Sequence, residues 1–179
     1  KLIGANLAGV NFTGAVLTQA DLTRANLMNV DLDDADLSGA ILIETSLIEA
    51  NLDHADLTDA NLSRANLTGA CLDRTNLSRA NLSNTFLSKA TFRKANLNQV
   101  NLQKSRLSNA DLSGVDLRGA DLSGANLTRA NLRGTGLEGA QLHGANLYEA
   151  DLTGADLSRA DLEGVNLIRA QLRIADLRW

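Results

Sequence analysis

The sequence Ala-Asp-Leu-Ser-Gly at residues 35–39 decides the fold, because the whole chain consists of variants of this five-residue unit. The central residue recurs without a slip at every fifth position from Leu2 to Leu177, and it is Leu throughout except at Phe12 and Phe92. The residue two before it is small, mostly Ala, and the residue between the two is mostly Asn or Asp. Internal repetition of this kind indicates a repeat architecture that extends over the whole chain.

A period of five fits neither regular secondary structure. Five residues of an α-helix turn through about 500°, so the Leu side chains would be spread around the whole helix. On a straight strand, an odd period directs successive Leu side chains to opposite faces. The pattern is satisfied if the chain bends after every unit, because Leu and the small residue then point to a common axis while the other residues point outward. The sequence therefore predicts a solenoid of short extended sides separated by corners.

The glycines indicate where the corners lie. All but one of the 14 Gly residues follow the central Leu by two positions, where a type II-like turn needs a positive φ. Residues such as Asn, Asp, Gln, Lys and Arg occupy this position elsewhere, so Gly is preferred there but not required. Proline is absent, as expected if nearly every backbone N–H pairs between stacked coils.

The units Ala-Asn-Leu-Ala-Gly at residues 5–9 and Ala-Asp-Leu-Ser-Arg at residues 155–159 resemble the repeat of the pentapeptide-repeat proteins. The resemblance covers residues 1–179 as a single domain and implies an all-β fold, a right-handed quadrilateral β-helix. It also implies four units per coil, hence about nine coils that each rise about 4.8 Å, a rod of roughly 43 Å. Periodicity alone gives a polygon, and its four sides come from the resemblance.

Charge varies along the chain, although the formal net charge is only −4. Up to Ser63 there are ten acidic and two basic residues, whereas residues 64–106 contain one acidic and eight basic residues. The remainder is mixed, with ten acidic and seven basic residues. One interpretation is a solvated rod whose outward positions vary freely, and the other is a patterned docking surface. The basic band consists of Arg64, Arg74, Arg79, Lys89, Arg93, Lys94, Lys104 and Arg106.

Stacking at twenty residues places Asp33, Asp53 and Asp73 in one outward column, with Arg93 next to Asp73 as partial compensation. Such carboxylates could attract a divalent cation, because Ca²⁺ and Mg²⁺ prefer oxygen ligands. We favour a plain exposed ridge and expect neither a metal nor another cofactor. The acidic ridge consists of Asp31, Asp33, Asp34, Asp36, Asp53, Asp56 and Asp59.

Catalytic groupings are missing from the sequence. His54 and His143 are more than four coils apart and on different sides, so they cannot share one site. Cys71 replaces an outward Asn or Asp and is interpreted as a surface substitution, with no disulfide framework. No Ser-His-Asp grouping, phosphate-binding Gly loop or metal-spaced Cys/His cluster occurs, and a filled rod offers no deep pocket. We therefore predict that the protein is not an enzyme.

Outward apolar residues are scarce, and exposed apolar clusters can mark contact surfaces. Ile41 and Ile43 lie outside on one side, and Met28 and Ile48 stack on the next. These four form one candidate cluster, and three further residues stand alone or in a C-terminal column. The complete candidate interaction surface is Met28, Ile41, Ile43, Ile48, Phe86, Tyr148 and Ile168.

The resemblance implies two functions. The first is a non-enzymatic scaffold, a rigid rod in a bacterial, most often cyanobacterial, protein; the array also resembles the repeat domain of a membrane-attached protein of heterocyst glycolipid layer formation. The alternative is a DNA mimic that inhibits or protects DNA gyrase, which the basic middle of the rod argues against. No nucleic-acid partner is expected, because the net charge is negative and aromatic residues make up only 3%.

Both ends of the sequence lie in mid-repeat without a polar cap, although solenoid ends need one. We therefore expect a piece of a longer protein, and end-to-end self-association through the faces around Leu2 or Leu177. No apolar run approaches the roughly 18 residues of a transmembrane helix, although the parent protein is expected to be membrane-attached if it belongs to the glycolipid-layer type. The sequence does not identify the protein partner.

Overall fold

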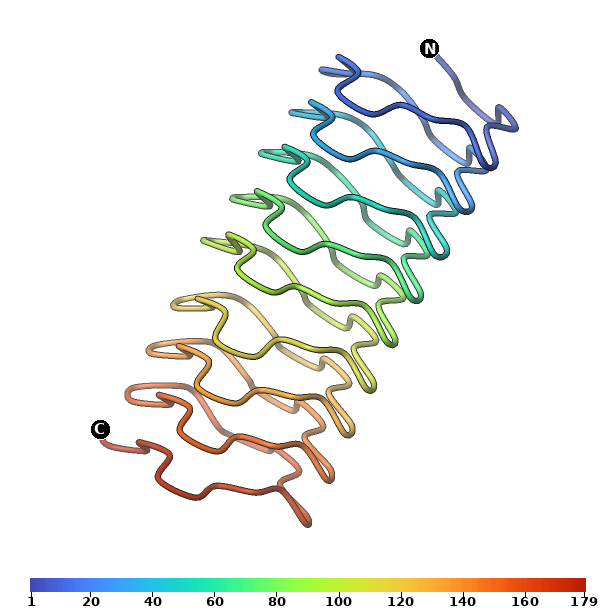
Figure 1. The fold of residues 1–179 in the computed structure, drawn as a ribbon. Coiled ribbons are helices and arrows are strands. Elements are labelled where there is room, and N and C mark those ends of the chain that lie inside the picture. Colours follow the sequence, from blue (N-terminus) through green and yellow to red (C-terminus); the bar gives the residue numbers. More distant parts are fainter.

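The computed structural model describes residues 1–179 as a β-solenoid, an elongated stack of coils with the termini at opposite ends (Figure 1). It contains no helix, and each strand is reduced to a single bridged residue. All bridges are parallel and join residues twenty apart, from Asn6 with Asn26 to Asp156 with Asp176. Because bridged residues recur every five positions, each coil has four sides, as the resemblance implies.

Each side ends in a two-residue turn that directs the chain around the next corner. In the first turn the Ala5 N–H donates to the Leu2 carbonyl over 3.1 Å, and the equivalent bond recurs at every later corner. The second turn residue has a positive φ at all corners, whether it is Gly or a residue such as Arg64, with φ 59°. A positive φ at this position alone is typical of a type II turn, so the predicted turn is confirmed. Non-glycine residues adopt it at a cost of about 1–2 kcal/mol each, which explains the preference for Gly.

In a regular repeat with an outward Asn or Asp, all five backbone N–H groups are used inside the solenoid. One closes the turn, one donates to the preceding coil and two donate to the following coil. The fifth donates to a side chain, so proline would break a bond at every position of the repeat. In residues 25–29, Ala25 N–H donates to Leu22 O, Asn26 to Ala5 O, Leu27 to Ser46 O, Met28 to Asn26 Oδ1 and Asn29 to Ile48 O.

The outward Asn or Asp supplies that side-chain acceptor, a role that the sequence analysis missed. Its Oδ1 accepts the N–H two residues later, as Asp36 does from Ser38 over 2.9 Å. Asn126 does the same from Thr128 over 3.1 Å. This is the local bond of an Asx turn. The preference for Asn and Asp therefore has a backbone cause, and an apolar residue at this position leaves one N–H without its acceptor.

The inward side chains form one continuous core of 51 buried residues. Every central residue from Leu22 to Leu157 is at most 2% exposed, which confirms the predicted inward Leu column. Five Thr or Ser residues replace Ala in the small column, and each hydroxyl is satisfied by a backbone carbonyl. Thr45, Thr75 and Thr135 donate to Leu22 O, Leu52 O and Leu112 O, whereas Thr85 and Ser105 donate to Leu82 O and Leu102 O.

One corner of the stack is irregular beside Phe92. Phe92 is completely buried, in a column where the adjacent coils carry the smaller Leu. The N–H groups of Lys94, Leu97 and Gln99 lack the bonds to the following coil that equivalent residues make elsewhere. In Figure 1 the yellow-green and amber coils stand further apart at the left edge than their neighbours do. The pairing between coils is therefore locally weakened there.

Candidate interaction surfaces

The rod presents four flat side faces, which we name after the first residue of each bridged column. These are the Asn6, Asn11, Val16 and Asp21 faces, and two-residue corners separate them. Both side chains of each corner point outward, together with the bridged residue of each face. Any site on this molecule is therefore built from columns whose members lie twenty residues apart.

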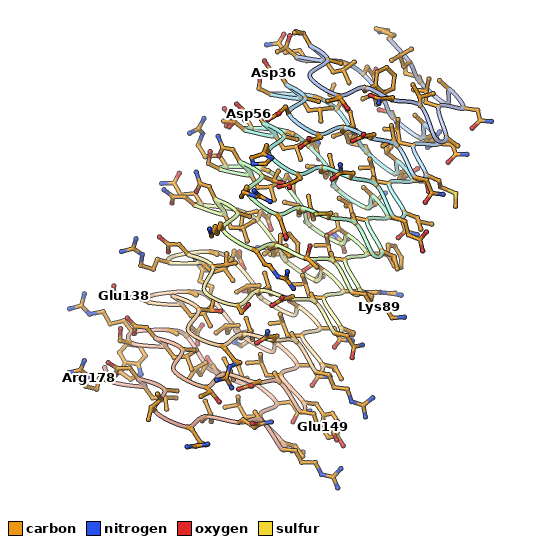
Figure 2. All side chains as sticks on the ribbon, viewed as in Figure 1. Asp36, Asp56, Lys89, Glu138, Glu149 and Arg178 are labelled. Carbon is orange, nitrogen blue, oxygen red and sulfur yellow. The ribbon has the colours of Figure 1, made fainter.

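The structure brings the acidic ridge together across two neighbouring faces. Its members lie on the Asn11 face, on the corner that follows, on the Val16 face and at the next corner, within adjacent coils. Figure 2 shows Asp36 and Asp56 one above the other in the Val16 column. A backbone hydrogen bond from Ser38 lowers the pKa of Asp36, and Arg79 lowers that of Asp59. Arg79 Nη2 lies 2.6 Å from Asp59 Oδ2.

His54 lies within this ridge, which gives the ridge mixed nitrogen and oxygen donors. Its Nδ1 is 3.3 Å from Asp33 Oδ1 and 3.5 Å from Asp53 Oδ1. Ligand atoms of Asp33, Asp34 and His54 all lie within 4.8 Å of one another. Asp53 Oδ1 is buried without a hydrogen-bond partner, while its Oδ2 accepts from Arg74 Nη2 at 2.9 Å. These residues could hold a divalent cation, although exposed carboxylates also gather without one.

His143 stands on a different corner from His54, and neither reaches the other. Ligand atoms of His143, Asp161 and Glu163 form a second group within 4.8 Å, with all three residues exposed. Both groupings join residues from adjacent coils, which only the twenty-residue register brings together.

The eight residues of the basic band divide into two classes. Four make ion pairs: Arg74 and Arg79 with the ridge, Arg64 Nη1 with Glu44 at 3.5 Å, and Arg93 Nε with Asp111 at 3.2 Å. Lys89, Lys94, Lys104 and Arg106 pair with no carboxylate in the structure. The guanidinium of Arg106 instead lies 4.6 Å from the centre of the Phe86 ring.

The expected compensation of Asp73 by Arg93 takes a different form. The Arg93 backbone N–H donates to Asp73 Oδ1 over 2.9 Å, while its guanidinium extends to Asp111 in the following coil. A long side chain at a corner can reach either neighbouring coil, and stacking order alone does not decide which.

Ion pairs along two corners were missed by the sequence analysis. Glu44 lies between Arg24 and Arg64 in one column, and Glu149 lies between Arg129 and Arg169 in another. Arg129 is the main cause that lowers the pKa of Glu149 to about 2. Alternating charge at a spacing of twenty is a sequence signal that could have found both.

The outward apolar residues occupy several columns. Ile41, 38% exposed, lies on the Asp21 face, while Ile43 lies at the corner that follows it. Met28 and Ile48 share the next corner, so a whole side separates them from Ile43. Phe86 is 37% exposed on the Asn6 face and Ile168 is 62% exposed. Tyr148 precedes Ile168 in its column, and its hydroxyl accepts from Arg169 Nη1 over 3.1 Å.

Val16 is a further exposed apolar residue that the sequence analysis missed. It is 76% exposed, and an apolar residue at an Asn/Asp position was the available signal. Two shallow open depressions mark the surface, of about 320 and 390 Å³. The first is lined by Glu138, Ser158, Arg159, Arg178 and Trp179, and the second by Thr18, Gln19, Ser38, Gly39, Thr58 and Asp59. The structure also contains no helix that could cross a membrane.

Comparison with protein families gives a match over the length of the chain. The family described as pentapeptide repeats (8 copies) matches residues 1–34, 31–69, 70–109, 110–147 and 145–179. A comparison with curated protein sequences gave no match.

Solved structures give similar folds. HetL, a pentapeptide repeat protein involved in heterocyst differentiation regulation from the cyanobacterium Nostoc sp. strain PCC 7120, is 35% identical. The similarity covers 96% of this chain and 86% of HetL, with a TM-score of 0.63. Rfr23 from the cyanobacterium Cyanothece 51142 is 29% identical over 65% of this chain and 90% of its own, with a TM-score of 0.59.

A more distant structure shows the fold alone. It is a trypsin-treated variant of QnrB1, a plasmid-mediated fluoroquinolone resistance protein. It is 23% identical over 90% of this chain and 88% of its own, with a TM-score of 0.71.

Proposed function

The chain belongs to the family of pentapeptide-repeat proteins, and on that premise we propose that it is a non-enzymatic scaffold, a rigid rod of about nine coils. Proteins of this family fold as right-handed quadrilateral β-helices and are generally structural or interaction proteins. The rod binds protein partners through its outward side chains and holds them at a fixed spacing. It forms a domain of a cyanobacterial protein.

The observation that carries this proposal is that the inward side chains and most of the backbone hydrogen bonds serve to build the rod itself. Leu and Ala fill the axis of the rod, and most backbone N–H groups bond within the solenoid. What is left for function is the set of side chains on four flat faces and their corners. Flat faces suit contacts with macromolecules, whereas small-molecule sites are generally concave.

The proposed process is heterocyst glycolipid layer formation. Its support is the regular array together with the 35% identity to HetL, which is involved in heterocyst differentiation regulation. Deletion of the gene in a heterocyst-forming cyanobacterium tests the assignment. We expect heterocysts at normal spacing that lack the glycolipid layer and fail to grow on dinitrogen. An intact layer with altered heterocyst spacing would instead assign the protein to the regulation of heterocyst differentiation.

Protection or inhibition of DNA gyrase is the second candidate function. The fold shared with QnrB1 and the acidic first third of the chain favour it. A DNA mimic needs a continuous negative field along the gripped length, and the basic band reverses that field at the centre. A gyrase supercoiling assay separates the two candidates, and we expect no inhibition by the purified protein. Sub-micromolar inhibition would place the gyrase function first.

A further inference from the structure

The Asn6 face differs in charge from the other three faces. Its bridged column runs from Asn6 to Asn166 and contains no Asp or Glu. Each of the other three columns contains at least three Asp residues. Asn side chains bond along part of the column, as Asn26 Nδ2 does to Asn6 Oδ1 over 3.0 Å. One side of an acidic rod is therefore free of carboxylates along its centre line.

Three of the four unpaired cations of the basic band gather on this face, while Lys94 lies at the corner between the Asn11 and Val16 faces. Arg106 belongs to its column, Lys104 stands at one bordering corner and Lys89 at the other. Figure 2 shows Lys89 on the edge of the rod that also carries Glu149. Between residues 63 and 129 the chain crosses this face and its two corners four times, at residues 63–69, 83–89, 103–109 and 123–129. None of these four segments contains an acidic residue. The resulting patch has uncompensated positive charge, whereas Arg74 and Arg79 on other corners are paired.

An aromatic side chain lies at the centre of the patch. Phe86 takes the place of the usual Asn or Asp, so the Ser88 N–H has no Oδ1 acceptor. Its ring is partly exposed and Arg106 lies over it, 4.6 Å from the ring centre. Aromatic and Arg side chains are enriched in protein–protein interfaces, where they supply much of the binding energy. The patch thus offers both cationic and apolar contacts.

The shape of the patch selects its class of partner. Both surface depressions lie elsewhere, so the patch does not enclose a small anion. A duplex is disfavoured because the patch spans only a few coils, about 4.8 Å each, before Glu49 and Glu149 border it. A duplex-binding protein that makes roughly 6–10 phosphate contacts needs more cations than this patch provides.

We propose that the Asn6 face between residues 63 and 129 docks an acidic protein segment that carries at least one apolar side chain. The proposal rests on the scaffold function and names the binding face and the chemistry of the partner. Carboxylates of the segment pair with Lys89, Lys104 and Arg106, and its apolar side chain packs on Phe86. The acidic remainder of the rod repels the same segment, so charge fixes both the position and the face.

Binding of a fluorescein-labelled peptide of repeated Glu-Glu-Leu tests the proposal. Fluorescence anisotropy at low ionic strength should rise on addition of the full chain, and the affinity should fall as salt is added. A matched Gln-Gln-Leu peptide should not bind. The variant K104E/R106E should lose about tenfold or more in affinity, whereas R74E/R79E, with the same net change in charge, should stay within about twofold.

Three results would overturn the proposal. These are no binding of the acidic peptide, equal losses in the two double variants, and tighter binding of a short DNA duplex than of the peptide. A dimer seen by sedimentation velocity that K104E/R106E abolishes would assign the face to a second copy of the chain instead. Circular dichroism of both variants checks their folding. Failure of the scaffold function would appear differently, as gyrase inhibition or catalytic turnover, which the peptide titration does not report.

Discussion

Replacement of Leu67 by Ala tests the inward Leu column at a regular, fully packed position. Leu67 is 0% exposed, as are Leu47 and Leu87 in the adjacent coils of its column. Its N–H donates to the Phe86 carbonyl over 2.7 Å, and equivalent bonds hold the coils on both sides. Because these bonds fix the spacing of the coils, the site cannot collapse around the missing atoms. We therefore expect a cost near the upper end of the Leu→Ala range of about 2–5 kcal/mol.

The matched control is Ile41→Ala, which removes a branched apolar side chain of equal carbon count from an outward position. Ile41 is 38% exposed, and its truncation should cost about 1 kcal/mol or less. Urea unfolding followed by far-ultraviolet circular dichroism measures both. With a slope of about 2 kcal/mol per molar urea, Leu67→Ala should lower the midpoint by roughly 2–2.5 M.

The location of the damage is a second readout of the same experiment. In a solenoid each coil contacts only its neighbours, so the loss should be local at first. Amide hydrogen exchange should accelerate in the coils that contain Leu47, Leu67 and Leu87 before it does so elsewhere. Equal urea midpoints for the two variants would refute the assignment of inward and outward positions.

Three further predictions follow from the local geometry. Asn126→Ala removes the acceptor of the Thr128 N–H and should destabilise the rod by about 0.5–1.5 kcal/mol in urea unfolding. An unchanged urea midpoint would contradict the role of Asn126 as a backbone acceptor. The pKa of Glu149 is lowered from 4.5 to about 2, chiefly by Arg129, so this carboxylate stabilises the fold above pH 4.5 and loses that effect as the pH falls towards 2. E149Q should therefore melt at a lower temperature than the wild type at neutral pH and match it near pH 2; a constant difference would argue against the pair. Phe92→Leu should slow amide exchange at Leu97, because the smaller side chain lets the coil of Leu97 approach the following coil and pair with it. Unchanged exchange would show that Phe92 does not cause the weakened pairing between these coils.

The sequence carries most of the information about the fold because the local rule is repeated so often. The five-residue period predicted the inward Leu, the small inward partner and the turn with positive φ, and the structure shows all three. The use of Asn and Asp as acceptors for backbone N–H groups was not foreseen, since an outward polar residue is equally consistent with simple solvation. The number of sides needed the family resemblance, because the angle of a corner is not encoded in the period.

For the candidate surfaces, the sequence predicted which residues share a column but not which side chains contact one another. A register of twenty places Asp33 near His54 and Glu44 near Arg64, and both neighbours can be found by counting along the chain. Counting does not reveal that the Arg93 guanidinium reaches Asp111 and not Asp73, because a flexible side chain at a corner can extend to the preceding or to the following coil.

By itself, the sequence determined a filled rod with a fixed inside and outside, because burial of one Leu in every five residues allows no other arrangement. Only the tertiary structure decided which charges remain uncompensated, among them Lys89, Lys104 and Arg106 around the Asn6 face. The physical reason is that pairing between charges depends on distances between side chains of neighbouring coils, which the four-sided path of each coil sets. The same path places no carboxylate on the centre line of the Asn6 face, although the chain as a whole is acidic.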